Sequence, residues 1–306
     1  MRMTEAQRLG MDELTGAQVT WNAPMDRYTT FRIGGPAEAV YAARDREELA
    51  RVLAFLRREA IPWRLLGAGS NLLVRDGGVP GVLIVLKGAL ASFERAAMNP
   101  FLVTAGAGLP VRSLMRRSLA DGFTGLEYLA GIPGTVGGAV AMNAGAFGKE
   151  IASSLASVTI LTASGEVRVM ECAELRFRYR QAEFPPETVI LEAGLNVEPS
   201  SSEAVRRRLQ TFLQRRKAGQ PWGAASAGSV FKNPPGDFAG RLIEEAGLKG
   251  KRIGGAEISR KHANFIVNTG TATAADVLAL MTLARERVHD RHGILLEAEI
   301  QIIGEE

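Results

Sequence analysis

The sequences LGAGSN at residues 66–71 and GIPGTVGG at residues 131–138 decide the predicted fold. Both are rich in glycine, whose backbone adopts positive φ angles and lets a ligand approach closely. Consecutive backbone N–H groups in such loops bind phosphate oxygens, and Ser70, Asn71 and Thr135 add side-chain donors. A tight structural turn would explain either loop alone. Two such loops in one half of the chain favour a long, phosphate-bearing cofactor.

Neither loop matches a common nucleotide-binding motif. The chain has no G-x-x-x-x-G-K-[ST] pattern, which excludes a P-loop. The pair Gly67 and Gly69 lacks the third glycine and the opening helix of a dinucleotide-binding Rossmann turn. The predicted cofactor site is therefore of another kind.

Hydrophobic periodicity places helices and strands around these loops. Asp45 can cap a helix that ends near Ala60. The glycine content of residues 125–148 predicts no regular element there. The expected strands are 63–66, 72–74, 82–86, 101–105, 158–162, 166–170, 189–197, 264–267 and 295–303. The expected helices are 45–60, 111–120 before Gly122, 203–216, 238–246, and 274–289 between Thr271 or Thr273 and Gly293.

The order of these elements predicts a mixed α+β and α/β chain. Residues 199–202 have the polar, proline-containing composition of a boundary. We expect two glycine-rich lobes at residues 1–92 and 93–204, and a third, α/β domain at residues 205–306.

Composition indicates a globular protein without a membrane segment. Hydrophobic residues make up 46% and charged residues 23% of the 306 positions, which is typical of globular chains. No apolar run reaches the roughly 18–20 residues that cross a bilayer. The N-terminus lacks the apolar core of a signal peptide, so we expect a cytoplasmic protein. Cys172 stands alone, and His262, His289 and His292 form no metal-ligand pattern, so we expect no metal.

The charge is only mildly basic but is biased toward arginine. The net charge is +4, and 30 of the 37 basic residues are Arg. Arginine suits phosphate and carboxylate binding, although genome composition explains the bias equally well. Arg206–Arg208 and Arg215–Lys217 share one predicted helix, where a solvated face is expected. Aromatic residues do not alternate with these charges, so we expect no nucleic-acid partner.

Longer motifs give the chain a resemblance to a known family. In the first half they are TTFRIGG at 29–35, GAGSN at 67–71, GLE at 125–127, GIPGTVGG at 131–138 and MNAG at 142–145. In the second half they are FRYR at 177–180, SAGSVFKNP at 226–234, RLIE at 241–244, AGLKG at 246–250, KHANF at 261–265 and LEAEI at 296–300. Over nearly its whole length the chain resembles the UDP-N-acetylenolpyruvoylglucosamine reductases.

The resemblance implies a two-lobe FAD-binding fold of the vanillyl-alcohol-oxidase type and a C-terminal α/β substrate-binding domain. Relatives within the wider fold attach flavin through His, Cys or Tyr. Because no histidine precedes His262, we expect non-covalent FAD. The residues implied for the cofactor are Arg32, Gly67, Ala68, Gly69, Ser70, Asn71, Gly131, Ile132, Pro133, Gly134, Thr135, Gly137, Gly138, Asn143 and Gly145.

The resemblance also implies a reaction. NADPH would reduce FAD, and the flavin would reduce UDP-N-acetylglucosamine enolpyruvate to UDP-N-acetylmuramate in a monomeric enzyme. Ser229 would protonate C2 of the enolpyruvyl group, while Arg180 and a protonated Glu299 would stabilise the developing enol. The residues implied for substrate binding are Tyr179, Lys232, Asn233 and His262.

Each catalytic candidate also has a structural explanation. Ser229 could cap a turn, Arg180 could form a surface ion pair, and Glu299 could lie on the exposed face of a strand. His262 could be a structural histidine. Only the joint match of the motifs favours the catalytic interpretation.

The chain departs from the family pattern at three positions. Thr29 replaces the usual Asn, Ala182 replaces a Ser, and Gly219 stands where many relatives have Lys before Gln-Pro. The chain resembles the shorter form of the family, which lacks a tyrosine-bearing insertion. Two other functions stay open at this point: an FAD-dependent oxidase of a sugar alcohol or lactone, and a phosphosugar- or nucleic-acid-binding module.

Overall fold

The structure is a computed structural model that describes residues 2–16, 18–96 and 98–306. Its backbone forms two compact units. The first consists of the segments up to Thr20, Ala39–Ala68 and Gly81–Gln214, and the second of Trp21–Glu38, Gly69–Pro80 and Arg215–Glu306. The predicted domain boundaries after residues 92 and 204 stay a prediction. Among the described residues, no helix has both the length and the apolar character needed to span a bilayer.

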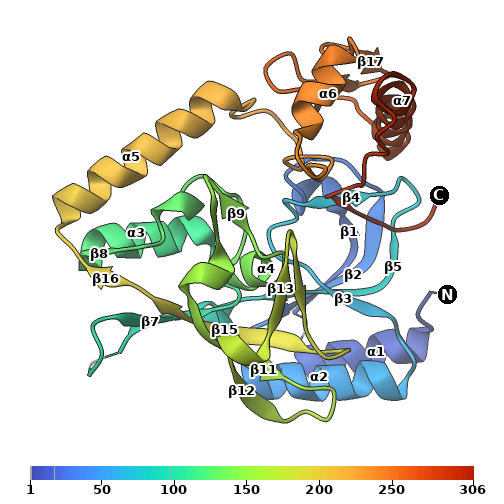
Figure 1. Cartoon of the computed structure of the whole chain (residues 1–306). Coiled ribbons are helices and arrows are strands. Elements are labelled where there is room, and N and C mark those ends of the chain that lie inside the picture. Colours follow the sequence, from blue (N-terminus) through green and yellow to red (C-terminus); the bar gives the residue numbers. More distant parts are fainter. Residues whose placement is uncertain (1, 17, 97) are drawn as a thin grey trace. The chain divides into compact units, whose positions relative to one another are not determined.

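A four-stranded sheet has the order β1, β2, β5, β3, with β3 parallel to β5. Helix α2 (Arg46–Arg58) begins at Asp45, whose side chain accepts from Glu48 N at 2.8 Å, so the predicted cap is confirmed. Helix α1 (Glu5–Thr15) lies beside α2 (Figure 1). The strands are β1 (Val19–Pro24), β2 (Pro36–Ala43), β3 (Trp63–Leu65) and β5 (Val79–Leu86).

Sequence reasoning missed β2 because its pattern is not that of a typical strand. Five consecutive residues, Ala37–Tyr41, are buried, so polar and apolar residues do not alternate. Four of the eight residues of β2 are alanine, a residue depleted in strands. Burial in the sheet thus overrides a weak local preference.

The first unit also contains a five-stranded antiparallel sheet in the order β12-β11-β15-β7-β6. Helices α3 (Val111–Asp121) and α4 (Val136–Ala141) contribute Leu114 and Val140 to a core shared with Val158 and Leu195 of this sheet. The predicted strands 158–162 and 166–170 correspond to β11 and β12, which pair antiparallel. The bounds are β6 (Phe93–Arg95), β7 (Leu102–Gly106), β11 (Leu155–Leu161), β12 (Val167–Glu171) and β15 (Val189–Asn196).

The prediction that residues 125–148 form no regular element is wrong. Helix α4 lies inside this stretch, and Thr135 Oγ1 accepts from Gly138 N at 3.3 Å at its start. Glycine lowers helix propensity, but Val136, Ala139 and Val140 are buried in the core. Tertiary packing of these residues stabilises the short helix. The short elements nearby are η3 (Glu127–Leu129), β9 (Gly145–Ala146), β10 (Lys149–Glu150) and η4 (Ile151–Ser154).

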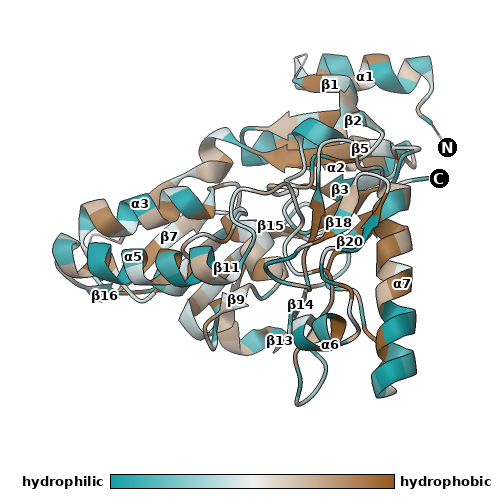
Figure 2. Ribbon diagram, turned by 90° about the horizontal axis from the view of Figure 1, so that it is seen from above, coloured by the Kyte–Doolittle hydropathy of each residue, from teal (hydrophilic) through white to brown (hydrophobic). Residues whose placement is uncertain are grey.

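Helix α5 (Ser202–Gly219) carries the arginine runs on a solvated face, as predicted. Arg206–Arg208, Arg215 and Lys217 are exposed, and the helix is largely hydrophilic in Figure 2. Arg216 is the exception, since it is buried. The apolar face of α5 packs against the core of the first unit. It is formed by Val205, Leu209, Phe212 and Leu213.

The second unit packs α6 (Ala239–Glu245) and α7 (Ala274–His292) with two small sheets. One sheet is antiparallel, β17-β18-β19, and the other pairs β4 with β20 in parallel. The predicted strand at residues 295–303 is therefore regular only in its last three residues. The bounds are β4 (Leu72–Val74), β17 (Arg252–Ile253), β18 (Ala256–Ile258), β19 (Ile266–Asn268) and β20 (Gln301–Ile303).

The start of α7 is held from a distant part of the chain. Of the two predicted caps, Thr271 and Thr273, the N-cap is Thr273, and Gly293 ends the helix with φ 68°, as predicted. In addition, the two carboxylate oxygens of Asp76 accept from Ala274 N at 2.8 Å and from Ala275 N at 3.0 Å. These are backbone N–H groups that the helix itself cannot satisfy. Asp76 thus binds the segment 69–80 to α7 within the second unit.

We expect the Asp76→Ala variant to unfold more easily than the wild type. Loss of a capping carboxylate should lower the free energy of unfolding by about 1–2 kcal/mol. Urea denaturation followed by circular dichroism measures this change. The matched control is Asp26→Ala, an exposed carboxylate near Asp76, which should change stability by less than about 0.5 kcal/mol. An equal loss in both variants would show that Asp76 is not a specific cap.

Candidate active site

The two glycine loops approach each other within the first unit. A Cβ atom added to Gly67 would lie 3.0 Å from Thr135 Oγ1, a distance at which the hydroxyl would have to move. Gly67 and Ala68 are exposed, and Thr135 is half-buried. A ligand that touches one loop can therefore touch the other, as the sequence predicts for a cofactor held by both.

Glycine at position 137 is required by packing. A Cβ there would lie 2.7 Å from the Cβ of Ala107, and Gly137 N donates to Ala107 O at 2.8 Å. The neighbouring Val136 N donates to Leu109 O at 2.9 Å. These two N–H groups bind backbone oxygens, so the hydroxyl of Thr135 and the backbone around Gly131 and Gly134 are the better candidates for ligand contacts.

Asn143 is a positioning residue in this structure. It is fully buried, and its Nδ2 donates to Glu150 Oε2 at 2.7 Å and to Arg178 O at 3.0 Å. Its Oδ1 accepts from Ala152 N at 3.3 Å. The side chain thus fixes the hairpin of β13 (Arg176–Arg178) and β14 (Gln181–Glu183), whose turn carries Arg180.

Arg180 lies beside Gly145, in the segment MNAG that follows the second glycine loop. A Cβ added to Gly145 would lie 2.5 Å from the backbone oxygen of Lys149, which requires glycine here, and 3.2 Å from Arg180 Nη1, which places the guanidinium close to this glycine. The guanidinium carbon lies 4.8 Å from the centroid of the Tyr179 ring, within the range of a cation–π contact. Arg180 is half-buried and adopts a left-handed backbone with φ 60°.

The first glycine loop continues into the second unit. Gly69 has φ 60°, and a Cβ there would overlap the carbonyl oxygen of Tyr28, which excludes any side chain. Asn71 Nδ2 donates to the backbone oxygen of Glu299 at 3.0 Å, and Gln301 N donates to Asn71 O at 2.9 Å. A residue predicted to bind the cofactor therefore contacts the backbone of a predicted catalytic residue.

Ser229 and Glu299 lie on neighbouring extended segments of the second unit. Glu299 N donates to Val230 O at 2.8 Å, and Lys232 N donates to Glu297 O at 2.9 Å. Both Ser229 and Glu299 are half-buried. Their proximity agrees with the sequence prediction, while their catalytic roles stay predictions.

The predicted substrate-binding residues of the second unit have structural partners as well. Lys232 Nζ lies 3.5 Å from Glu297 Oε2, and Asn233 Oδ1 accepts from Ala239 N, at the start of α6, at 3.1 Å. His262 Nδ1 accepts from Asn264 N at 3.3 Å. Burial and the charge of Lys249 lower the pKa of His262, so the ring is neutral near pH 7.

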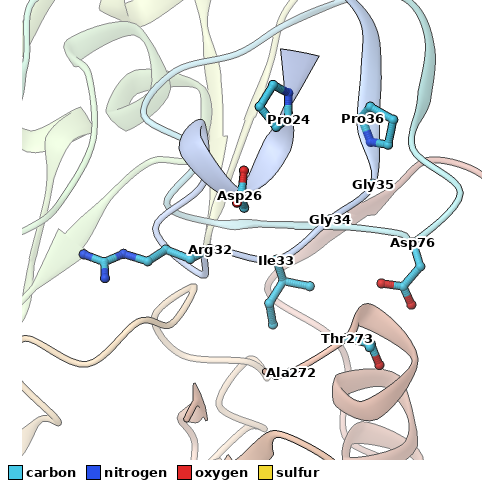
Figure 3. A pocket seen from close by; sticks show the side chains of 10 residues that line it. All are labelled: Pro24, Asp26, Arg32, Ile33, Gly34, Gly35, Pro36, Asp76, Ala272 and Thr273. Atoms are coloured by element: carbon cyan, nitrogen blue, oxygen red, sulfur yellow. The ribbon is translucent and has the colours of Figure 1, made fainter. Parts of the chain in front are cut away.

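Arg32 lines a groove of about 400 Å³ in the second unit (Figure 3). The guanidinium extends away from the other labelled side chains, and its backbone is left-handed with φ 55°. Asp26 and Asp76 line the same groove, and two carboxylates there would repel a diphosphate. The predicted contact of Arg32 with FAD thus stays a prediction and does not involve this groove.

Sequence reasoning gave no role to Asn264, although it lies in the family motif KHANF. The residue is buried, and both ends of its amide bind the backbone of Phe231. Its only sequence signal is a polar residue inside an apolar run, which is also typical of a structural asparagine.

Comparisons with known proteins agree on one family. The model of the UDP-N-acetylenolpyruvoylglucosamine reductase C-terminal domain matches residues 220–303, and that of an FAD-binding domain matches residues 37–171. The reductase of that name from Syntrophus aciditrophicus is 43% identical over 94% of this chain and 93% of the relative. The crystal structure of UDP-N-acetylenolpyruvylglucosamine reductase from Thermus caldophilus is 40% identical, has a TM-score of 0.80, and covers 93% of this chain and 97% of that chain.

These matches confirm the predicted fold class, an FAD-binding fold of the vanillyl-alcohol-oxidase type followed by the C-terminal domain of the reductase family. The loops of the first unit fit FAD on structural grounds. Glycine occupies the position where a Cβ would crowd the facing hydroxyl of Thr135, and neither loop contains an acidic side chain that would repel a diphosphate.

We expect the Gly67→Val variant to bind FAD at least tenfold more weakly, a loss of about 1.4 kcal/mol. The added methyl groups would fill the space between Gly67 and Thr135 that the ligand requires. Flavin-fluorescence titration of the apoprotein measures the dissociation constant. The matched control is Gly219→Val, because a Cβ at Gly219 meets no atom within 4 Å. Equal affinities for both variants would exclude Gly67 from the cofactor site.

Proposed function

The chain belongs to the family of UDP-N-acetylenolpyruvoylglucosamine reductases, and we propose that it reduces UDP-N-acetylglucosamine enolpyruvate to UDP-N-acetylmuramate with NADPH. This reaction supplies a precursor of peptidoglycan. One observation carries the proposal at the level of the site: Ser229 and Glu299, both in family motifs, lie on hydrogen-bonded neighbouring segments. The family of the chain supplies the substrate and the reductant.

The two glycine loops would hold FAD non-covalently, and the bound cofactor would supply the two-electron (hydride) chemistry between NADPH and the substrate. Gly67 faces the hydroxyl of Thr135 across the space between the loops, and the absence of a side chain at Gly67 would let the backbone come close to the diphosphate. The other predicted cofactor residues, Ala68, Ser70, Ile132, Pro133, Gly134 and Gly138, belong to the same two loops.

The reduction adds a hydride to C3 and a proton to C2 of the enolpyruvyl group. We assign the proton to the hydroxyl of Ser229, which regains it from solvent at the end of the cycle. A serine hydroxyl is a weak acid in water, so a nearby cation is needed to stabilise the alkoxide. Lys232, three residues along the same segment, is the candidate, and its ammonium group lies 3.5 Å from the carboxylate of the exposed Glu297.

Negative charge develops on the substrate carboxylate before C2 is protonated. We assign its stabilisation to Arg180 and Glu299. The guanidinium of Arg180 can hold a carboxylate through two N–H groups, and its contact with the Tyr179 ring restricts its rotation before the substrate binds. Glu299 must be protonated in this role, because a second carboxylate would repel the intermediate.

Two finer assignments belong to this proposal. We place the protein in the cytoplasm, where NADPH and the nucleotide sugar occur, and we propose that it acts as a monomer. Light scattering on the purified protein tests the second assignment directly. An FAD-dependent oxidase of a sugar alcohol or lactone is not favoured, because the C-terminal half carries the reductase motif SAGSVFKNP.

We expect the Ser229→Ala variant to separate the two halves of the reaction. In anaerobic stopped-flow experiments, NADPH should bleach the flavin at the wild-type rate. Reoxidation by the enolpyruvyl substrate should slow by about 10²–10⁴-fold, the usual contribution of a general acid. The matched control is Ser226→Ala, which removes a hydroxyl three residues away and should reoxidise normally. Unimpaired reoxidation of Ser229→Ala would remove Ser229 from this role.

A further inference from the structure

Residues 229–232 are held at both edges. On one edge, Val230 N donates to Asn264 O at 2.8 Å, and Ser229 forms a bridge with Phe265. On the other edge, Glu299 N donates to Val230 O at 2.8 Å, and Phe231 forms a bridge with Ala298. The hydrogen bonds to these two neighbouring segments therefore determine the position of the Ser229 backbone relative to Glu299.

The side chain of Asn264 also holds this segment, through two hydrogen bonds to the backbone of Phe231. Asn264 Oδ1 accepts from Phe231 N at 2.9 Å, and Asn264 Nδ2 donates to Phe231 O at 2.8 Å. Only 3% of Asn264 is exposed, so water does not compete for these bonds. The amide thus satisfies the donor and the acceptor of one residue at once, a pairing that a one-residue shift of the segment would break.

We propose that Asn264 is a positioning residue for the proton transfer and that it acts through its two hydrogen bonds to the Phe231 backbone, which we call the Asn264 clamp. The inference rests on the role proposed for Ser229. Asn264 contacts no reacting atom in this scheme. It fixes the backbone two residues beyond Ser229, and a displacement of about 1 Å in a catalytic group can slow a reaction on the order of 10²-fold.

The decisive variants are Asn264→Leu and Asn264→Asp. The leucine side chain is similar in size and removes both hydrogen bonds. The carboxyl group introduced by Asn264→Asp has the shape of the amide, but it donates a hydrogen bond only when it is protonated. In its ionised form it faces the carbonyl oxygen of Phe231 and repels it. Burial disfavours the ionised form, so this clamp should re-form as the pH falls.

For Asn264→Leu we expect reoxidation by the enolpyruvyl substrate to slow on the order of 10²-fold, with unchanged flavin reduction by NADPH. For Asn264→Asp we expect a similar defect at high pH and a recovery toward the wild-type rate as the pH is lowered. His262 is the titratable group next to Asn264. The wild type and Asn264→Leu also contain His262. Comparison of their pH profiles with that of Asn264→Asp therefore separates the titration of His262 from that of the introduced carboxyl group.

A double variant tests whether the effect passes through the serine. Ser229→Ala combined with Asn264→Leu should reoxidise no more slowly than Ser229→Ala alone, since the group to be positioned is already absent. Thermal melting verifies that each variant is folded. If Asn264→Leu does not fold, the pH profile of Asn264→Asp decides alone.

The inference is overturned if folded Asn264→Leu reoxidises at the wild-type rate, or if the Asn264→Asp profile parallels that of the wild type. It is also overturned if the double variant is much slower than Ser229→Ala. A failure of the proposed function would look different, because the wild-type protein itself would then not be reoxidised by the enolpyruvyl substrate.

Discussion

The parallel pairing of β4 with β20 is the constraint on which the second unit depends. It joins Leu72–Val74 to Gln301–Ile303, residues separated by most of the chain. Phe31, Ile33 and Leu73 from the N-terminal third are buried in the same core as the helices α6 and α7. Burying three such side chains contributes about 1.5–3 kcal/mol each. The C-terminal region cannot complete its core without these segments.

This constraint also explains where sequence reasoning was strong and where it was weak. Local signals were read correctly: Asp45 and Thr273 cap helices, and Gly122 and Gly293 end them. Each is decided by one or two neighbouring residues. Residues 21–38 and 69–80 belong to the second unit, but no sequence pattern in either segment predicts this. Their packing partners lie some two hundred residues away in the sequence.

The glycines of the candidate site fall into two physical classes, which the sequence alone does not separate. Gly69 and Gly137 are fixed by the protein itself, since a Cβ at either position would collide with Tyr28 or Ala107. Gly67 differs because its surroundings are open except for the hydroxyl of Thr135. A motif of closely spaced glycines therefore combines residues needed to build the loop with residues that leave room for a ligand.

Backbone strain gives an independent indication of function. Among the described residues, seven other than glycine have a positive φ, and three of them, Arg32, Asn143 and Arg180, are site residues implied by the family resemblance. Such conformations cost on the order of 1–3 kcal/mol each and persist only where the surroundings enforce them. Glu150 and Arg178 hold the side chain of Asn143, and Asn268 Nδ2 holds the carbonyl oxygen of Arg32 at 3.1 Å. These hydrogen bonds hold Asn143 and Arg32 in backbone conformations that are unfavourable for residues other than glycine.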